Sequence, residues 1–405
     1  MKLSLPKTKP LPLWHWVIAA IITGIVLLAV TTWAADTWEI LQQRITGTTW
    51  EKEKLASRVA SISAELTKLQ NDDQYKRNQE LNRNIAQIET TYSQTVSVYE
   101  DLLRLKETSK SLPAGKGGTS KFDEAFAGIL VLLSKRDYEK AAGDLAKLKQ
   151  DISTEREKIA STFVIPANVP SSNAPPGSGF SRQSVNADIG TYLVDIVASD
   201  MGSTRVIVDT ASDGTCPKDC PVSSLGDYVA KNGAYAGING SYFCPADYPS
   251  CADKKNSFDT LLMNKNKVYF NSENNVYSSV PAVIFSGSSM RFVGRSLDWG
   301  RDTGIDGMIA NQPLLLSGGN IVFGGGSDPK QGSKGARSFV GNKGGTAYIG
   351  VVHNATVAEV AHVLKALGLE GALNLDSGGS TALWSGGYKV GPGRNIPNAI
   401  LFVRK

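Results

Sequence analysis

The sequence predicts an α+β protein: a strand-rich C-terminal domain with few helices, preceded by one transmembrane helix and an all-α, coiled-coil-like stalk. Three observations carry this prediction. Val17–Ala35 is an apolar run without a charged residue, apolar residues then recur at steps of three and four, and many short alternating runs with glycine-rich turns follow Ser184. Many strands with few helices favour an α+β domain, because a doubly wound sheet needs strands and helices in alternation.

The apolar run is long enough to span the hydrocarbon core of a bilayer, about 30 Å, at about 1.5 Å per residue. Aromatic and basic residues flank it: Trp14, Trp16 and Trp33, with Lys2, Lys7 and Lys9 on the N-terminal side. Tryptophan favours membrane interfaces and lysine the cytoplasmic side. The sequence therefore predicts a single-pass protein of the cell membrane, with residues 1–13 cytoplasmic, residues 14–35 as anchor and the C-terminal domain extracytoplasmic.

A cleavable signal peptide is the alternative to an anchor, because Thr32-Trp33-Ala34 is an acceptable small-residue cleavage site. A signal core has about 7–15 apolar residues, fewer than this run. We therefore favour the uncleaved anchor.

Residues 36–162 are predicted to form the helical stalk. One seam steps by four and three residues, and a second repeats the pattern: Leu55, Val59, Ile62, Leu66 and Leu69, then Leu81, Ile85, Ile88 and Tyr92. This spacing is typical of a coiled coil, with its register broken at Asn71–Asn78. An intrachain helical hairpin and a parallel homodimer both fit. After the loop Ser111–Ser120, a second helical pair is predicted at Phe122–Leu133 and Tyr138–Ile159, with its apolar residues used for helix packing.

Residues 163–183 contain four prolines and predict a semi-rigid linker. The domain that follows, 184–405, has nine strand-like runs: Thr191–Ser199, Thr204–Asp209, Ala234–Asn239, Pro281–Phe285, Met308–Leu316, Thr346–His353, Ala372–Asp376, Ser380–Trp384 and Asn398–Val403. Helices are predicted at Leu225–Lys231 and Thr356–Leu367. The second begins with Thr356-x-x-Glu359, which is a capping box and explains Glu359 without a functional role.

The chain has four cysteines, all in the part predicted to be exported: Cys216, Cys220, Cys244 and Cys251. An even, clustered set in an oxidising compartment indicates two disulfides with three possible connectivities. We favour the local pairs Cys216–Cys220 and Cys244–Cys251. A four-cysteine zinc site is the alternative, and the absence of Cys-x-x-Cys spacing counts against it.

The formal net charge of +5 includes three lysines of the N-terminal flank, and the stalk balances 20 basic against 20 acidic residues. The chain has no large basic field, so nucleic-acid binding lacks its electrostatic basis.

Ala372–Trp384 (ALNLDSGGSTALW) brings one carboxylate, Asp376, into a glycine turn between two strand-like runs. Backbone N–H groups of Ser377-Gly378-Gly379 can converge on an anion, while Asp376 can transfer a proton. An ordinary β-hairpin turn explains the same residues on conformational grounds.

Five segments in this order resemble the phosphodiester glycosidase family: AGINGSYFCP from Ala236, GARSFVG from Gly335, AYIGVVHN from Ala347, ALNLDSGGSTALW and RNIPNAILF from Arg394. The resemblance covers about the last 220 residues, within the single-domain range. Two family glycines are serines here, Ser241 and Ser377. The resemblance implies a hydrolase acting on N-acetylglucosamine 1-phosphodiesters.

The resemblance and the residue chemistry together select the candidate site. Asp376 is the leading catalytic residue, and His353, at the end of an apolar run, is a second proton donor. Arg337 and Arg394 are expected to bind phosphate, because a guanidinium grips planar anions through two bonds. The remaining substrate-binding candidates are Asn239, Gly240, Asn374, Ser377, Gly378 and Gly379.

No cofactor is expected, and no metal-ligand constellation is visible. One carboxylate is few for a hard cation, so a divalent ion such as Ca²⁺ at Asp376 is left open. The predicted function is cleavage of a glycosyl 1-phosphodiester in a surface glycan, with cell-wall polymer or exopolysaccharide as the setting. The alternatives are a non-catalytic module that binds phosphorylated glycans, motivated by the two serines, and an assembly protein that acts through its stalk.

Overall fold

The computed structural model describes residues 13–110, 118–273 and 278–405. The chain divides into two compact units, Met1–Gln87 and Ile88–Lys405. The predicted cytoplasmic flank, apart from its last residue, lies outside the described residues, as does most of the predicted loop Ser111–Ser120.

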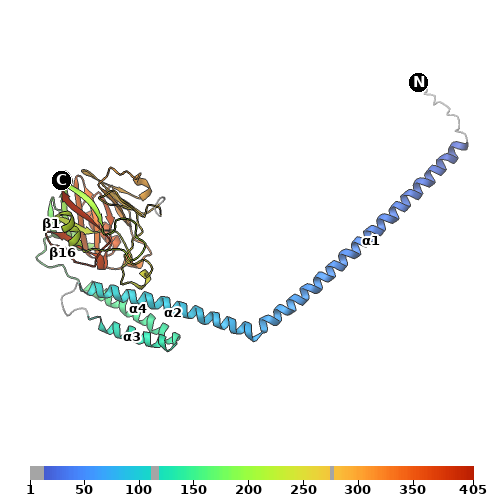
Figure 1. Cartoon of the computed structure of the whole chain (residues 1–405), viewed down its shortest axis with the longest axis horizontal. Helices are drawn as coiled ribbons and strands as arrows, with labels where there is room; N and C mark the ends of the chain where they lie inside the picture. The colour runs from blue at the N-terminus through green and yellow to red at the C-terminus, as the bar shows by residue number, and fades with distance from the viewer. Residues whose placement is uncertain (1–12, 111–117, 274–277) are drawn as a thin grey trace, which may run out of the picture. The chain divides into compact units, whose positions relative to one another are not determined.

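Helix α1 (Leu13–Asn71) and the first part of α2 (Asp73–Lys110) form the N-terminal unit (Figure 1). One stretch of α1 is long and apolar enough to cross a membrane, a test that a signal sequence near the N-terminus would also pass. The break between the two helices falls at Asp72, inside the predicted interval Asn71–Asn78.

The stalk seams are exposed in the single chain: Leu55, Val59, Ile62, Leu66, Leu69, Leu81, Ile85, Ile88 and Tyr92. A hairpin of α1 on α2 would bury these side chains against each other, so the intrachain hairpin is absent from the structure. The parallel dimer stays a prediction.

Three helices pack together at the start of the second unit: the C-terminal part of α2, α3 (Ser120–Ser134) and α4 (Tyr138–Ser161). Their shared core consists of Val98, Leu102, Leu105, Phe122, Ile129, Ala141, Leu145, Leu148, Ile152 and Ile159. The side chain of Asp137 caps α4 by accepting a hydrogen bond from the Lys140 N–H. Both predicted helices of this pair are therefore present.

The rest of the second unit contains three antiparallel sheets (Figure 1). The first has the order β1 (Gly179–Ala187), β2 (Gly190–Asp200), β13 (Thr346–Ala355), β12 (Gly335–Lys343), β14 (Gly371–Asn374), β10 (Leu314–Ser317), β11 (Asn320–Ile321). The second is β16 (Tyr388–Val390), β15 (Leu383–Ser385), β4 (Ala236–Asn239), β17 (Asn398–Arg404), β3 (Thr204–Thr210). The third is β6 (Tyr269–Phe270), β5 (Leu262–Met263), β9 (Gly307–Ala310), β7 (Ala282–Ser286), β8 (Ser289–Val293).

The helical elements of this domain are short: α5 (Leu225–Asn232), α6 (Pro329–Gly332), α7 (Val357–Ala366), η1 (Pro249–Cys251), η2 (Ser296–Trp299) and η3 (Gly378–Ser380). The predicted α+β class is confirmed. The capping box of α7 is also present, since the Thr356 hydroxyl accepts from the Glu359 N–H and the Glu359 carboxylate accepts from the Thr356 N–H.

Strand β17 shows why the sheets stack. Ile400 and Phe402 enter the central core shared by the sheets, whereas Leu401 and Val403 enter the core beneath α5. Because successive side chains of a strand point to opposite faces, an unbroken apolar strand is buried on both sides. Helix α7 covers one face of the seven-stranded sheet in the same way, through Val360, Val363 and Leu364.

Three predicted elements differ from the structure. Met308–Leu316 is divided into β9 and β10, with Pro313 in the interruption. Strand β1 begins at Gly179, inside the segment predicted as linker. The hairpin interpretation of Ala372–Trp384 is wrong, because β14 pairs with β12 and β10 while β15 pairs with β4 and β16. The turn after Asp376 therefore passes from one sheet to another.

Candidate active site

A cavity of about 370 Å³ opens beside the turn that joins the two sheets. Its charged lining has six basic and three acidic side chains: Arg104, Arg156, Lys330, Lys334, Arg337 and Arg394, with Glu107, Asp328 and Asp376. Such a lining favours an anionic ligand.

Asp376 reaches this cavity from the end of β14. Its backbone N–H donates to the Gly240 carbonyl oxygen (2.9 Å), which joins the chain after β14 to the chain after β4. Its Oδ1 atom accepts the Ser377 N–H (2.9 Å), and the Ser380 side chain also hydrogen-bonds the carboxyl. The carboxyl is thus held by its own turn.

The buried side chain of Asn239 fixes the position of this turn. Its side-chain amide donates to the Asp376 carbonyl oxygen (2.6 Å), and its Oδ1 atom accepts from the Ser338 hydroxyl and the Ala382 N–H. Asn239 is fully buried and does not line the cavity. The structure therefore places Asn239 as a clamp between strands and not against a ligand.

Asn374 is also fully buried and lies outside the cavity lining. Its amide donates to the Tyr242 hydroxyl (2.6 Å) and the Gln312 carbonyl oxygen (3.0 Å). Two further buried asparagines complete the scaffold, since Asn311 accepts the Tyr242 N–H and Asn398 accepts the Ser241 N–H. These amides position the loops that surround the site.

Burial raises the pKa of the Asp376 carboxyl to about 7, against the opposing effects of its hydrogen bonds and of Arg337. A carboxyl in this range is present in both protonation states near neutral pH. That property suits a group that exchanges protons with a substrate or a water molecule.

The raised pKa predicts how stability depends on pH. Between about pH 4 and pH 7 the folded chain keeps a proton on Asp376 that the unfolded chain has lost. The free energy of unfolding therefore falls as the pH rises through this window. Asp376→Asn cannot ionise, so we expect its free energy of unfolding to exceed that of the wild type by roughly 2 to 4 kcal/mol at pH 8 and by little at pH 4. Denaturant unfolding at both pH values checks this, and a pH-independent difference would contradict it.

Arg337 enters the cavity wall from β12 and is buried, with 8% of its surface exposed. Its Nε atom donates to the Ala355 carbonyl oxygen (3.1 Å), and its Nη2 atom donates to the carbonyl oxygens of Lys330 (2.7 Å) and Ser333. Burial lowers the pKa of the guanidinium. Among the described residues no bond uses Nη1, so this nitrogen is the one left to contact a ligand.

Replacing Arg337 by lysine is expected to lower the free energy of unfolding by roughly 1 to 3 kcal/mol, because a single ammonium cannot satisfy carbonyl oxygens on both β13 and the α6 segment. Arg205→Lys is the matched control, since Arg205 is exposed on β3. Thermal unfolding of both full-length variants measures the effect. Equal stabilities of the two variants would show that the separate hydrogen bonds from Nε and Nη2 of Arg337 are not needed for the stability of the fold.

Arg394 also lines the cavity, and its backbone N–H donates to the Gly379 carbonyl oxygen of the turn (2.8 Å). Its guanidinium pairs with the Glu107 carboxylate and faces the Tyr248 ring at 5.2 Å. Burial lowers the pKa of Arg394 to about 10. The side chain therefore remains a cation at neutral pH.

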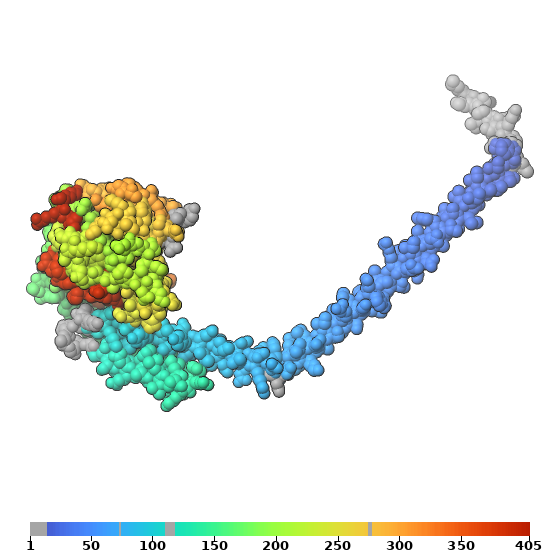
Figure 2. All heavy atoms as spheres, in the orientation of Figure 1, coloured from blue at the N-terminus to red at the C-terminus, as the bar shows by residue number. Residues whose placement is uncertain are grey.

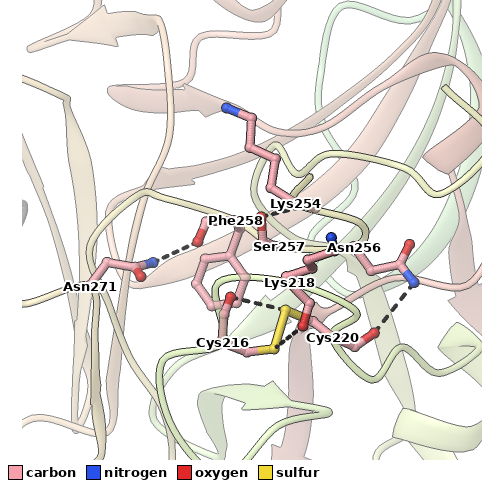
Figure 3. The surroundings of a disulfide bond; sticks show 8 residues. All are labelled: Cys216, Lys218, Cys220, Lys254, Asn256, Ser257, Phe258 and Asn271. Atoms are coloured by element: carbon pink, nitrogen blue, oxygen red, sulfur yellow. Dashed lines mark hydrogen bonds between the residues drawn. A yellow bond between two sulfur atoms is a disulfide. The ribbon is translucent and has the colours of Figure 1, made fainter. Parts of the chain in front are cut away.

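Tyr248 is carried by a loop that the Cys244–Cys251 disulfide closes. The second disulfide, Cys216–Cys220, lies in a neighbouring loop (Figure 3). Asn256, which follows both loops in the sequence, holds them together, because it donates through its side chain to the Cys220 carbonyl oxygen and through its backbone N–H to that of Cys244. The structure thus contains the two local pairs expected from the sequence.

His353 is not brought to the cavity. Its Nε2 atom bonds the buried Asp195 carboxylate (2.8 Å), which also receives two bonds from Arg182, and its ring stacks on Phe163. These contacts hold the end of the helical region to β13 and give His353 a structural role. Among the described residues no cluster of three or more His, Cys, Asp or Glu side chains is arranged to hold a metal ion.

One family model matches most of the part of the chain that carries the five sequence motifs. Residues 232–403 match the family model of the phosphodiester glycosidases. This part of the chain thus has the sequence of a phosphodiester glycosidase domain. The resemblance seen in the sequence is therefore confirmed. A search of the curated proteins found no match.

Three solved structures are similar to this chain. A hypothetical protein from Synechocystis is 14% identical with a TM-score of 0.40, covering 56% of this chain and 62% of its own. The zebrafish N-acetylglucosamine-1-phosphodiester alpha-N-acetylglucosaminidase catalytic domain, auto-inhibited by pro-peptide, is 16% identical with a TM-score of 0.43, covering 58% and 87%. A putative exported protein from Burkholderia pseudomallei is 11% identical with a TM-score of 0.35, covering 53% and 74%. This chain thus spans less than two thirds of the Synechocystis protein.

Within the phosphodiester glycosidase domain, the two serines that replace family glycines are accommodated differently. Ser241 is buried, and its hydroxyl accepts from the Asn398 amide (3.1 Å). Ser377 lines the cavity with an extended backbone at φ −142°, which any residue adopts. Gly378 follows at φ +65°, the conformation that favours glycine. The substitution at 377 therefore adds a hydroxyl to the cavity wall of this glycosidase domain without backbone strain.

Of the candidates from the sequence, five line the cavity of the glycosidase domain: Asp376, Arg337, Arg394, Ser377 and Gly378. Asn239, Gly240, Asn374, Gly379 and His353 do not, although the Gly379 N–H donates to Glu107, which does line the cavity. Tyr248 has no sequence signal that marks it as a site residue, and Arg104, Glu107 and Arg156 were predicted only as parts of a helical stalk. The charges of the stalk carried no signal, because isolated charges on a helix are typical of a solvated face.

Proposed function

We propose that this chain is a membrane-anchored, extracytoplasmic hydrolase that cleaves glycosyl 1-phosphodiesters, N-acetylglucosamine 1-phosphodiesters in particular, in a surface glycan such as a cell-wall polymer or exopolysaccharide. One observation carries the proposal: a carboxyl with a pKa of about 7 faces a cationic cavity inside a phosphodiester glycosidase domain.

The proposed reaction is hydrolysis at the anomeric carbon. The Asp376 carboxylate accepts a proton from a water molecule, the water oxygen bonds to the anomeric carbon, and the bond from that carbon to the phosphate oxygen breaks. The products are a free sugar and a phosphomonoester. A general base is most effective when its pKa lies near the working pH, which favours Asp376 for this step.

Arg337 and Arg394 are proposed to hold the phosphate. The phosphodiester has one negative charge and the leaving phosphomonoester gains a second, so cations beside it stabilise the transition state more than the ground state. Both guanidinium groups line the cavity that Asp376 faces, and both are largely withdrawn from water. The proposed steps use only side chains of this chain.

The proposed location rests on two features. The apolar stretch of α1 has the length and composition of a membrane span, and two disulfides are typical of proteins that work in an oxidising compartment. With the N-terminus in the cytoplasm, the anchor would present the glycosidase domain to glycans outside the cell membrane.

Incubating the full-length protein with UDP-N-acetylglucosamine and with a simple α-N-acetylglucosaminyl phosphodiester tests the proposal. We expect free N-acetylglucosamine in equal amounts with UDP from the first compound and with the phosphomonoester from the second. If a folded protein binds these compounds and releases no sugar from either of them or from other glycosyl phosphodiesters, the chain is a binding module and the proposal is wrong.

A further inference from the structure

One face of α2 lies against the mouth of the active-site cavity. Glu100, Arg104 and Glu107 follow one another at steps of four and three residues, so they share a face of the helix. Glu100 accepts the Ser250 N–H (3.2 Å), and the Arg104 guanidinium lies over the Tyr248 ring at 5.5 Å. In Figure 2 the loop around residue 250 meets the surface of α2. This polar face is separate from the apolar face that packs on α3 and α4.

The Glu107 carboxylate sits in a cradle of three donors from the glycosidase domain. It pairs with the Arg394 guanidinium, accepts the Gly379 N–H (3.2 Å) and accepts the Tyr248 hydroxyl (3.4 Å). A guanidinium, a backbone N–H and a phenol are all donors, and together they form a binding set for an oxyanion.

The cradle requires glycine at position 379. A Cβ atom there would lie 2.5 Å from the carboxyl carbon of Glu107 and 2.5 Å from Nη2 of Arg394. An anion in the cradle therefore rests directly on the main chain of the turn that begins at Asp376. Two non-bridging oxygens of a phosphodiester present the same charge and the same pair of acceptors as a carboxylate.

Glu107 also lies in a cavity whose charged side chains are mostly basic. Among the nine charged side chains that line the cavity, it is one of three acids facing six bases. Arg156, on α4, lines the same cavity and makes no hydrogen bond or ion pair with any residue that the structure describes. Withdrawal of Glu107 would therefore leave a strongly cationic site beside Asp376.

We propose that the cradle formed by Arg394, the Gly379 N–H and Tyr248 is the phosphate subsite of the enzyme, and that Glu107 of α2 occupies it as an internal competitor. The identity of the phosphate as part of a glycosyl phosphodiester rests on the proposed function. An anionic substrate must displace Glu107 before it binds, so its apparent affinity is reduced by the fraction of chains in which the cradle is filled. The stalk thereby controls access to the glycosidase domain.

Binding of inorganic phosphate to the full-length protein tests this proposal without requiring turnover. We would measure the dissociation constant by calorimetry for the wild type, Glu107→Gln and Glu107→Ala. Glu89→Gln is the matched control, because Glu89 is exposed on α2 and lies 18 residues, or about five helical turns, before Glu107 on the same side of the helix. We expect both Glu107 variants to bind phosphate at least tenfold more tightly than the wild type, and Glu89→Gln to bind as the wild type does.

Wild-type affinity in both Glu107 variants, with unchanged melting temperatures, would overturn the proposal and leave the Glu107–Arg394 pair as a structural contact. Adding Arg394→Ala to Glu107→Gln should abolish the gain, and a gain that survives would place the subsite elsewhere. Sugar release is recorded separately. Tighter phosphate binding in the Glu107 variants, without sugar release by any variant, would support the phosphate subsite and reject the proposed hydrolase. Sugar release with unaltered phosphate binding would support the hydrolase and reject the subsite.

Discussion

Replacing Asp376 by asparagine is expected to lower kcat for sugar release by roughly 10²- to 10⁴-fold, the range that removal of a general acid or base typically produces. Asparagine keeps the shape and can still accept the Ser377 N–H that the carboxylate accepts (2.9 Å). The loss would therefore report on proton transfer and not on the fold of the turn. Steady-state kinetics on full-length protein provide the measurement, with Asp213→Asn, an exposed loop residue, as the matched control.

The pH dependence of the wild type adds an independent check on the same residue. A base with a pKa of about 7 must be ionised to act, so kcat/KM should rise tenfold per pH unit below about pH 7 and level off above it. A profile that is flat from pH 5 to pH 8, or an Asp376→Asn enzyme with the activity of the Asp213→Asn control, would remove Asp376 from the chemistry.

Gly240→Ala is expected to lower the free energy of unfolding by about 3 kcal/mol and to abolish activity. A Cβ atom at this position would overlap the Asn398 side chain and lie 2.9 Å from the Asn398 carbonyl oxygen, and overpacking against a main chain has no easy relief. The Gly240 carbonyl oxygen also accepts the Asp376 N–H, so a shift here moves the catalytic turn.

The control for Gly240→Ala is Gly345→Ala, because a Cβ atom at Gly345 would meet nothing within 4 Å and its backbone is not left-handed. Chemical denaturation of the two full-length variants compares them directly. Similar stabilities would mean that a movement of β17 relieves the clash. The close approach of Gly240 to Asn398 would then not require glycine at position 240.

Local signals in the sequence predicted local structure well. The Thr356-x-x-Glu359 pattern specified the start of α7, because its hydrogen bonds involve only residues of the first turn. The apolar run Asn398–Val403 predicted β17, since a continuous apolar strand needs only to be buried on both faces. Neither inference depended on distant parts of the chain.

Pairing between strands could not be predicted in the same way. Ser377-Gly378-Gly379 has the composition of a turn, and the chain does turn there. The composition does not specify which strands receive the flanking segments, because that choice depends on burial against distant residues. The two segments joined different sheets, and the turn became the junction that holds Asp376.

The residues of the candidate site also fall into those with a local sequence signal and those without one. Asp376, Arg337 and Arg394 were found because each lies in a motif of the family, whereas Tyr248 has no such signal. Glu107 is 272 residues from Gly379 in the sequence, and on its own it is one more acidic residue of a polar helix. Only the folded chain shows that a stalk carboxylate reaches the turn that follows Asp376.

We propose that this chain hydrolyses a glycosyl phosphodiester at the anomeric carbon. Turnover of an α-N-acetylglucosaminyl phosphodiester in ¹⁸O-labelled water, followed by mass spectrometry of both products, tests it most directly. Attack of water on the anomeric carbon would place one ¹⁸O atom in the released sugar, from the first turnover, and leave the phosphomonoester unlabelled. Label in the phosphate would mean that the bond to phosphorus is the one broken, and the assignment as a glycosidase would be wrong.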